Sequence, residues 1–464
     1  MRIIMKFGGS LLSSRGGIKR VARIVADYSE EHQLVVVVSA MGDVTDILLK
    51  AADDARGWDR TQIDHLVNQM KEMHFKALRG AGLAGNQGVY KKVEDLLERL
   101  RLALLGVSIL GELTLRSRDL ILSFGERLSA PIVAASLESI GLRTKVRTGG
   151  EAGIMTDDSY GEALPVERST KRQVRRRLIP LISRGIVPVI TGFIAQTESG
   201  EVTTLGRGGS DFSATILAAN IGAHEVWIWT DVDGIMTADP RTVGDARVIG
   251  ELSYAEAEEM AFFGAKNMHP LALEPAKLAR IPIRIKNGFK PDLLGTMICS
   301  SQKKSASVVK SVALVGNVGL LTVSGETLAG RPGIAARIFG LLAGAGINIL
   351  MISQSVSEAH ISVVLRSSML AKGARILSRG LVESKIRAKV DVEPDIAVLA
   401  AVGAGMKGTL GVAAKVFTAM SKAGVNVRMI AQGSSELNIS FVVGFRDATR
   451  AIRALHSALV LSSK

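Results

Sequence analysis

The sequence has a single cysteine, Cys299, and few aromatic residues, which make up 4% of the chain. One cysteine excludes an intrachain disulfide and a zinc site built from several thiolates. It is also typical of proteins that work in a reducing cytoplasm, where we therefore expect this one. The scarcity of aromatic side chains argues against a nucleic-acid-binding surface that stacks bases.

Long apolar runs are missing as well. The longest, residues 34–40 and 396–402, have the length of buried strands and fall far short of the roughly 18–20 residues of a membrane span. Residues 1–10 contain Lys6 and two glycines where a signal peptide needs an apolar stretch. We therefore expect neither a membrane partner nor secretion.

Positive charge is in excess, with a formal net charge of +14. One interpretation is affinity for nucleic acid through phosphate contacts, and the other is a solvated surface that attracts small anions. The densest basic run, residues 171–177, falls in a predicted helix without any aromatic platform. We therefore expect a solvated helix face and no nucleic-acid partner, and a salt-dependent DNA-binding assay would decide between the two.

The chain of 464 residues is too long for one hydrophobic core. Its first 300 residues alternate short apolar runs with helical patterns, which is typical of α/β folds with a doubly wound, mainly parallel sheet. Residues 61–115 read as a helical subdomain beside that sheet. The predicted strands are residues 3–7, 34–40, 143–147, 187–191, 225–230 and 281–286.

An internal repeat lies beyond a Ser- and Lys-rich stretch at residues 300–311, which we interpret as a linker. Residues 333–365 align without gaps with residues 411–443, and about half of the positions are identical. Each copy reads as helix, Gly-Ile/Val-Asn turn, strand, polar turn and strand. With the strands and helices around them, the copies predict two ferredoxin-like α+β domains.

We place a catalytic domain at residues 1–300 and the two small domains at 311–393 and 394–464. The first small domain has a candidate closing strand at residues 386–392, whereas almost no chain follows the last helix of the second. The sequence leaves open whether the two copies share or exchange a strand.

The first chemical motif comprises Lys6, Phe7, Gly8 and Gly9, directly after a strand and before a helix. Consecutive glycines let backbone N–H groups approach phosphate oxygens, and Lys6 would add an ammonium group. The spacing is not that of a P-loop. A Gly-Gly turn in this position is more often only a turn.

The second motif, residues 206–211, opens a predicted helix at residues 212–220. A capped helix after a flexible loop is the simplest interpretation. Arg207 between glycines argues for more, because a guanidinium on a bare loop can bind a carboxylate or phosphate with two hydrogen bonds. Asp211 could orient Lys6 or align the acceptor of a phosphoryl group.

Three further segments carry polar groups after strands or at helix starts. Residues 230–241 form either an acidic turn or part of a nucleotide site at the rim of the sheet. Residues 39–46 offer hydroxyl and acidic groups. Glu126 begins a helix, where a glutamate more often stabilises the helix dipole than binds a ligand.

These motifs together resemble the aspartokinases of the amino-acid kinase superfamily, and the tail resembles that family's tandem ACT domains. The resemblance covers nearly the whole chain. The matching motifs occur in the family's order as KFGGS, VVVVSAMGDVTD, SFGERLSA, TLGRGGSDFSA, WTDVDGIMTADPR and FGAKNMHP.

The resemblance implies an ATP-dependent kinase that phosphorylates the β-carboxylate of L-aspartate, the first step of lysine, threonine and methionine biosynthesis. It implies that Lys6 neutralises the transferring phosphoryl group and that Asp211 organises the catalytic lysines and the acceptor. It places Ser39, Thr45, Glu126 and Arg207 around aspartate, with Glu126 receiving the α-ammonium and Arg207 a carboxylate.

The same resemblance implies that Lys6, Phe7, Gly8, Gly9, Thr230, Asp231, Met236, Arg241 and Lys266 line the ATP site. Met236 departs from the family pattern, where Tyr is frequent, so an aromatic contact to the nucleotide would be lost. Magnesium is expected to arrive bound to ATP, and we predict no metal site made of protein side chains. The barrier would come from bringing two anions together, so positive charge and positioning should dominate catalysis.

The tail is interpreted as an amino-acid sensor or, alternatively, as a dimerisation module without ligand. We expect a homodimer or larger homo-oligomer assembled through the tail. The Gln-x-x-Ser-Glu pattern is more similar to threonine-responsive than to lysine-responsive relatives, so we expect feedback inhibition by threonine. The residues predicted near the effector are Asn348, Gln354, Asn426 and Gln432.

Two alternatives remain. Glutamate, acetylglutamate and carbamate kinases share the glycine-rich motifs but lack this tail. A non-catalytic amino-acid sensor would need no catalytic charges, and the presence together of Lys6, Arg207, Asp211 and Lys266 argues against it.

Overall fold

The computed structural model describes residues 1–263, 269–300, 308–325, 328, 332–357, 359–384 and 386–461. It divides into two compact units. Unit 1 consists of Met1–Ile235, Val248–Tyr254 and Lys266–Gln302, and unit 2 of Met236–Arg247, Ala255–Ala265 and Lys303–Lys464. Segments 236–247 and 255–265 therefore belong with the C-terminal part of the chain, although they precede the predicted linker.

Unit 1 is built on an eight-stranded sheet in the order β3-β5-β2-β1-β8-β10-β11-β9. Its strands are β1 (Arg2–Phe7), β2 (Gln33–Val38), β3 (Thr144–Arg147), β5 (Val187–Thr191), β8 (Glu225–Thr230), β9 (Glu251–Ser253), β10 (Ile283–Asn287) and β11 (Thr296–Cys299). All neighbours are parallel except β10 and β11. This confirms the predicted mainly parallel α/β sheet.

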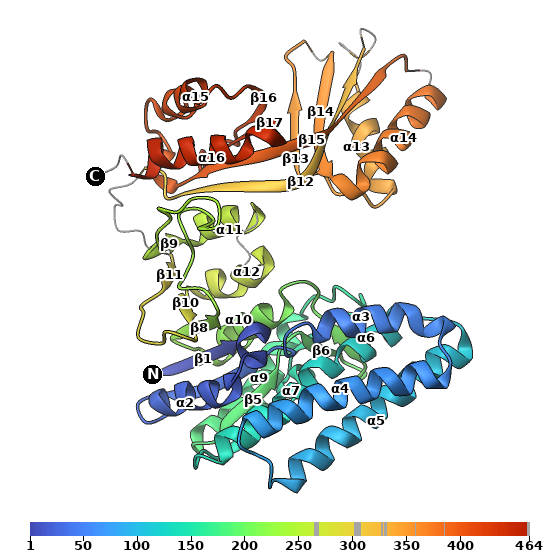
Figure 1. Ribbon diagram of the computed structural model, residues 1–464, viewed down its shortest axis with the longest axis vertical. Coiled ribbons are helices and arrows are strands. Elements are labelled where there is room, and N and C mark those ends of the chain that lie inside the picture. The colour runs from blue at the N-terminus through green and yellow to red at the C-terminus, as the bar shows by residue number, and fades with distance from the viewer. Residues whose placement is uncertain are drawn as a thin grey trace. The chain divides into compact units, whose positions relative to one another are not determined.

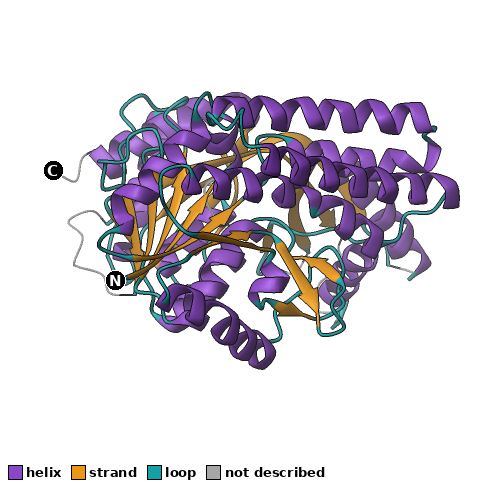
Figure 2. Ribbon diagram, turned by 90° about the horizontal axis from the view of Figure 1, so that it is seen from below, coloured by secondary structure: helices purple, strands orange, loops and turns teal. Residues whose placement is uncertain are grey.

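Helices cover both faces of this sheet (Figure 2), which is why β2 is a run of buried aliphatic residues. The helices of unit 1 are α1 (Gly9–Ser13), α2 (Gly17–Ser29), α3 (Val44–Asp54), α4 (Arg60–Gly80), α5 (Gln87–Leu110), α6 (Leu115–Leu122), α7 (Phe124–Glu138), α8 (Gly149–Ala152), α9 (Glu167–Ser183), α10 (Gly209–Ile221) and α12 (Pro270–Ala279). A short 3₁₀ turn, η1 (Ala55–Gly57), follows α3. A small sheet, β4 (Met155–Thr156), β6 (Ile194–Thr197) and β7 (Val202–Thr204), completes the unit.

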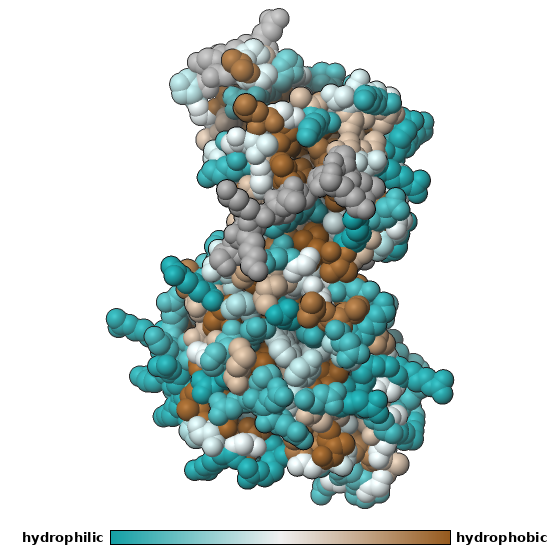
Figure 3. Space-filling view, turned by 90° about the vertical axis from the view of Figure 1, so that its left-hand side faces the viewer, coloured by the Kyte–Doolittle hydropathy of each residue, from teal (hydrophilic) through white to brown (hydrophobic). Residues whose placement is uncertain are grey.

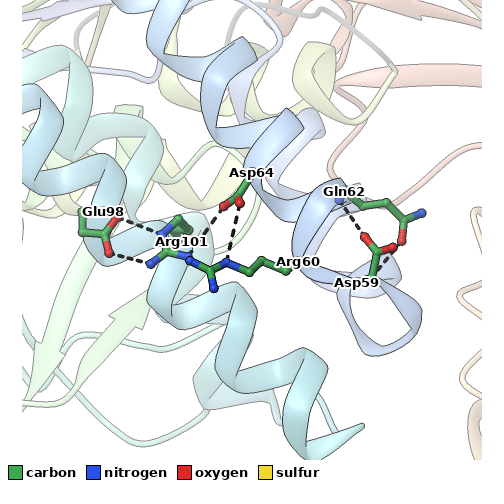
Figure 4. Close-up of polar contacts among 6 residues, drawn as sticks. All are labelled: Asp59, Arg60, Gln62, Asp64, Glu98 and Arg101. Carbon is green, nitrogen blue, oxygen red and sulfur yellow. Dashed lines mark hydrogen bonds and ion pairs between the residues drawn. The ribbon is translucent and has the colours of Figure 1, made fainter.

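The helical pattern at residues 61–115 forms two long helices, α4 and α5, which pack side by side (Figure 1). Asp59 caps α4 in a reciprocal hydrogen-bond pair with Gln62 (Figure 4). Arg101 of α5 binds both carboxylate oxygens of Glu98, at 2.8 and 2.9 Å, and lies 3.6 Å from Asp64 of α4. Each exposed ion pair contributes little to stability. The two helices are therefore held together mainly by their buried apolar faces.

In the part of the chain that the structure describes, one stretch, Leu115–Glu138, is long and apolar enough to cross a membrane by length and composition. In the protein, 89% of the most apolar part of this stretch is buried, as in a core helix. The face drawn in Figure 3 is mostly hydrophilic, with separate small apolar patches. The stretch is therefore explained by packing around the parallel sheet.

Unit 2 contains a six-stranded antiparallel sheet in the order β13-β14-β12-β15-β17-β16. Its main elements are α11 (Tyr254–Phe262), β12 (Ser311–Ser324), α13 (Ile334–Gly344), β13 (Met351–Gln354), β14 (His360–Arg366), α14 (Ser367–Glu383), β15 (Lys389–Val402), α15 (Val412–Lys422), β16 (Val427–Ala431), β17 (Asn438–Gly444) and α16 (Ala448–His456). Short turns are η3 (Ala404–Met406), η4 (Phe445–Asp447) and η5 (Ser457–Leu461). The two α+β repeats expected from the sequence are present.

Strands β12 and β15 are each 14 residues long and run through both repeats. Residues 318–324 of β12 pair with 389–396 of β15, whereas residues 311–315 pair with 398–402. The predicted closing strand of the first repeat is thus continuous with the opening strand of the second. The missing fourth strand of the second repeat is the N-terminal part of β12, so the repeats share two strands.

Candidate active site

A cavity of about 1140 Å³ in unit 1 collects side chains that are far apart in the sequence. It lies where strands of the parallel sheet end, the usual place for ligands in open α/β folds. The predicted residues that line it are Lys6, Gly9, Ser39, Thr45, Glu126, Arg207 and Asp211. The roles assigned to them are taken up as proposals below.

Lys6 and Asp211 form an ion pair in this cavity. The Lys6 Nζ lies 2.6 Å from an Asp211 carboxylate oxygen, and both side chains are 11% exposed. Lys6 comes from the end of β1 and Asp211 from the first turn of α10, where a carboxylate also interacts favourably with the helix dipole. The pair holds the lysine ammonium in place without burying an uncompensated charge.

Gly9 is required by a close approach of two backbone segments. A Cβ at this position would lie 2.5 Å from the Ala40 carbonyl oxygen, which follows β2. The loops after β1 and β2 are therefore packed against each other, and Ser39 and Lys6 come to line the same cavity. The Ser39 carbonyl also accepts a hydrogen bond of 2.8 Å from the Ser129 hydroxyl of α7.

Glu126 lies in the first turn of α7 and is only 3% exposed. Burial raises its pKa to about 8, and backbone hydrogen bonds, the Lys6 charge and the Ser210 hydroxyl oppose this rise. Within the described part of the chain, its Oε2 atom has no hydrogen-bond partner. A buried carboxylate with an unsatisfied oxygen at a cavity wall is suited to receive a cationic ligand group.

Arg207 lies on the loop between β7 and α10, flanked by Gly206 and Gly208, whose φ angles are +70° and +71°. These left-handed conformations favour glycine and turn the chain sharply around the arginine. The Arg207 side chain is exposed at the cavity, and it forms no ion pair with the described residues. Its guanidinium can therefore bind an anionic group of a ligand.

Asp119 of α6 is a site residue that the sequence did not reveal. It is fully buried and accepts hydrogen bonds from the Thr204 N–H and hydroxyl, at 2.9 and 2.8 Å, and from the Gly161 N–H at 3.0 Å. Burial raises its pKa, and these hydrogen bonds oppose the rise. Asp119 thereby fixes the end of β7 just ahead of the Arg207 loop.

Phe193 is a second residue that the sequence did not reveal. It lines the cavity with a φ of +65°, unusual for a residue with a side chain, and its N–H binds the Ser213 hydroxyl of α10 at 2.9 Å. No sequence signal marked either residue, because a lone Asp in a helix and a lone Phe in a loop are common.

Most of the residues predicted to bind the nucleotide do not lie at this cavity. Phe7 is fully buried and stacks on Trp229 at 6.1 Å, and the Gly8 N–H binds the Trp229 carbonyl at 3.1 Å. Thr230 ends β8 and donates a hydrogen bond of 3.1 Å to the next residue, Asp231. The predicted residues Phe7, Gly8, Thr230 and Asp231 do not line the cavity.

Met236 and Arg241 belong to unit 2. The Met236 carbonyl accepts a hydrogen bond from the Ser311 hydroxyl, and Arg241 pairs with Asp239 on an exposed turn. Lys266 lies outside the described residues. A nucleotide site made of these residues remains a prediction.

The predicted effector residues occupy equivalent places in the two repeats. Asn348 precedes β13 and Gln354 ends it, while Asn426 precedes β16 and Gln432 follows it. All four side chains are exposed, and β13 and β16 are the two edge strands of the sheet. The duplication is therefore preserved in three dimensions.

The cavity is chemically suited to the phosphates of a nucleotide, because Lys6 presents a fixed ammonium group beside the glycine-containing loop. Among the described residues, no group of three or more His, Cys, Asp or Glu side chains could hold a metal ion.

Comparisons with known proteins agree with these features. Residues 1–287 match the model of the amino acid kinase family, and residues 321–381 and 399–459 each match an ACT domain. Aspartokinase 2 of Arabidopsis thaliana, a chloroplastic protein, is 35% identical over 98% of this chain and 84% of its own length. Aspartokinase 3 of the same plant is 34% identical over 98% of this chain and 81% of its own.

Solved structures are similar as well. The complex of E. coli aspartokinase III with aspartate and ADP matches with a TM-score of 0.83 and 29% identity, over 99% of this chain and 100% of the other. The complex of the same protein with lysine and aspartate matches with a TM-score of 0.82 and 29% identity, over 99% of both chains. This chain therefore belongs to the amino acid kinase family and, within it, to the aspartokinases.

Proposed function

We propose that this protein is an aspartate kinase that transfers the γ-phosphoryl group of ATP to the β-carboxylate of L-aspartate. The observation that carries the proposal is one cavity that holds the Lys6–Asp211 pair, the buried Glu126 and the exposed Arg207. Aspartate has one ammonium and two carboxylates; Glu126 offers a partner for the ammonium and Arg207 a partner for a carboxylate. The E. coli relative whose structure contains aspartate and ADP supports the same substrates.

In the proposed reaction, Glu126 receives the α-ammonium of aspartate and Arg207 a carboxylate, with Ser39 and Thr45 at the cavity wall. A β-carboxylate oxygen attacks the γ-phosphorus, the bond from that phosphorus to the bridging oxygen breaks, and ADP leaves with the electron pair. The attacking carboxylate is already ionised at neutral pH, so no strong general base is needed.

Lys6 offsets the negative charge on the transferred group, and Asp211 holds the Lys6 ammonium toward it. Magnesium, when bound with ATP, would neutralise phosphate charge. Preorganised positive charge in a partly desolvated site is the main source of catalysis in this scheme. Thr230, Asp231, Met236, Arg241 and Lys266 are proposed, from the family pattern alone, to line the ATP site.

A coupled assay of ADP release over a panel of acidic amino acids tests the substrate. We expect turnover with L-aspartate and at least tenfold lower kcat/KM with glutamate and N-acetylglutamate, because an added methylene or a blocked ammonium group misplaces the reacting carboxylate. ADP release without an acceptor is the background to subtract. Preference for another carboxylate would favour a different kinase of the same family, and no turnover would favour a sensor.

We further propose that the ACT repeats bind an amino-acid effector near Asn348, Gln354, Asn426 and Gln432. The preserved duplication of these positions supports this proposal, as does the E. coli relative whose structure contains lysine and aspartate. The sequence pattern favours threonine as the effector. A homo-oligomer assembled through these domains, a role in lysine, threonine and methionine biosynthesis and a cytoplasmic location belong to the same proposal.

Activity measured against threonine, lysine and methionine, each titrated separately, tests the effector. We expect threonine to inhibit, and the double variant Gln354→Ala and Gln432→Ala to weaken this inhibition about tenfold through lost polar contacts. The variant should keep its uninhibited activity, because unit 1 holds the proposed catalytic residues. Inhibition by lysine alone would reject threonine, and no response to any of the three would favour a purely structural tail.

A further inference from the structure

A second cavity in unit 1, of about 440 Å³, has a cluster of cations in its lining. Five basic side chains border it, and a single carboxylate, Glu151, lies among them. The cations come from three elements that the fold brings together: Lys92 and Arg99 from α5, Arg127 from α7, and Lys145 and Arg147 from β3. These positive charges are therefore brought together by the fold from separate parts of the sequence.

Acidic residues offset only part of this positive charge, because Glu151, whose charge raises the pKa of Arg127, is one carboxylate among five cations. Glu94 of α5 forms an ion pair with Lys71 of α4, and Glu98 of α5 forms one with Arg101 of the same helix (Figure 4 shows the second pair). Glu151 accepts a hydrogen bond of 2.8 Å from the Thr148 N–H and so caps α8. Among the described residues, none of the five cations forms an ion pair within 4.0 Å.

The guanidinium of Arg127 lies in an electrostatically unfavourable environment. Its Nε atom is buried without a hydrogen-bond partner among the described residues. Burial lowers the pKa of its guanidinium, and the charge of Arg99 lowers it further. Its Cζ atom lies 5.6 Å from the centre of the Phe124 ring, a contact that compensates only in part. A half-buried guanidinium that faces another cation is stabilised by an added anion.

We propose that this cavity is a binding site for a small molecule with two or more negative charges on phosphate or carboxylate oxygens. Its volume is within the range of small-molecule sites. Arginine and lysine are the side chains that recognise such groups with charge-assisted hydrogen bonds. The cations surround one cavity and do not follow a continuous groove, which favours a compact anion over an extended polymer.

The anion site shares its wall with the proposed catalytic cavity. Adjacent residues of α7, Glu126 and Arg127, line the catalytic cavity and the anion site respectively. The chain from the end of β5 to the start of β6 does the same, with Phe193 in one cavity and Thr191 and Ile194 in the other. An anion bound here would therefore lie directly behind residues that shape the substrate site.

Calorimetric titration of the full-length protein with pyrophosphate, and separately with citrate, tests the proposal. ADP and aspartate are kept saturating, so that the catalytic cavity is filled. We expect saturable binding that weakens as salt rises, and an at least tenfold lower affinity in the double variant Lys145→Gln and Arg147→Gln. Stronger binding of pyrophosphate would identify a phosphate ligand, and stronger binding of citrate a polycarboxylate; either result supports the site.

The matched control is the double variant Arg172→Gln and Arg175→Gln, which removes two charges from the exposed face of α9. It should bind both anions like the parent protein. If the β3 variant does not fold, Lys92→Gln on the surface of α5 replaces it. Equal affinity in site and control variants, no binding, or tighter binding of a DNA oligonucleotide than of either anion would overturn the proposal. Direct binding needs no turnover, so these outcomes are independent of the kinase assignment.

Discussion

Replacing Lys6 by Met is expected to lower kcat by about 10²–10⁴, because it removes a preorganised positive charge that stabilises the transition state. The Lys6 ammonium lies 2.6 Å from Asp211 in the catalytic cavity, so its position is fixed before substrates bind. Methionine retains the length of the side chain but has no charge. The variant leaves the Asp211 carboxylate without its ionic partner, so we expect a folded but less stable protein.

Initial rates at saturating ATP and aspartate measure this effect, and a thermal melt checks the fold. Lys50→Met on the exposed surface of α3 is the matched control, since it removes the same charge outside the cavity. It should retain parental activity. Near-normal turnover in Lys6→Met would show that this cavity is not where phosphoryl transfer takes place.

Glu126→Gln is expected to raise the KM for aspartate by about 10- to 100-fold, because a hydrogen bond to a charged group contributes about 1.5–3 kcal/mol. Glutamine keeps the shape and one carbonyl oxygen but cannot balance the α-ammonium charge. The effect on kcat should be smaller, since Glu126 does not touch the transferred phosphoryl group in the proposed reaction. A variant with unchanged KM would remove Glu126 from the aspartate site.

The pH dependence separates this role from a purely structural one. The pKa of Glu126 is raised to about 8 by burial, so part of the free protein holds it protonated at neutral pH. In the parent protein, kcat/KM should rise as pH increases toward 8, because only the ionised form attracts the ammonium group. Glu126→Gln should lose this rise. A parallel rise in both proteins would assign it to another group.

The raised pKa of Glu126 also makes folding stability depend on pH. Stability falls as pH rises, whereas kcat/KM increases. The folded protein binds a proton at Glu126 more tightly than the unfolded chain, whose glutamates have the ordinary pKa of 4.5. Stability from this group is therefore present at low pH and is lost as pH rises from about 4.5 to about 8. Glu126→Gln should flatten that part of the stability profile.

Much of the fold could be predicted from the sequence because it depends on local patterns. A run of valines predicts a strand buried on both faces, and this run forms β2. The gapless repeat predicts two similar small domains, and both are present. Lys6 and Arg207 stood out because charged groups next to glycines are suited to phosphates and carboxylates, whatever the rest of the fold.

The tertiary structure decided the features that depend on residues far apart in the chain. Asp119 became a site residue only through Thr204, 85 residues away, and the second repeat is completed by the N-terminal part of β12. The cluster of cations around Arg127 likewise needs α5, α7 and β3 together. The sequence by itself determined the elements, the repeat and the charged motifs, because these follow from local periodicity and side-chain chemistry. The shared strands, the buried carboxylates and the anion site follow from strand register and burial, which only long-range packing determines.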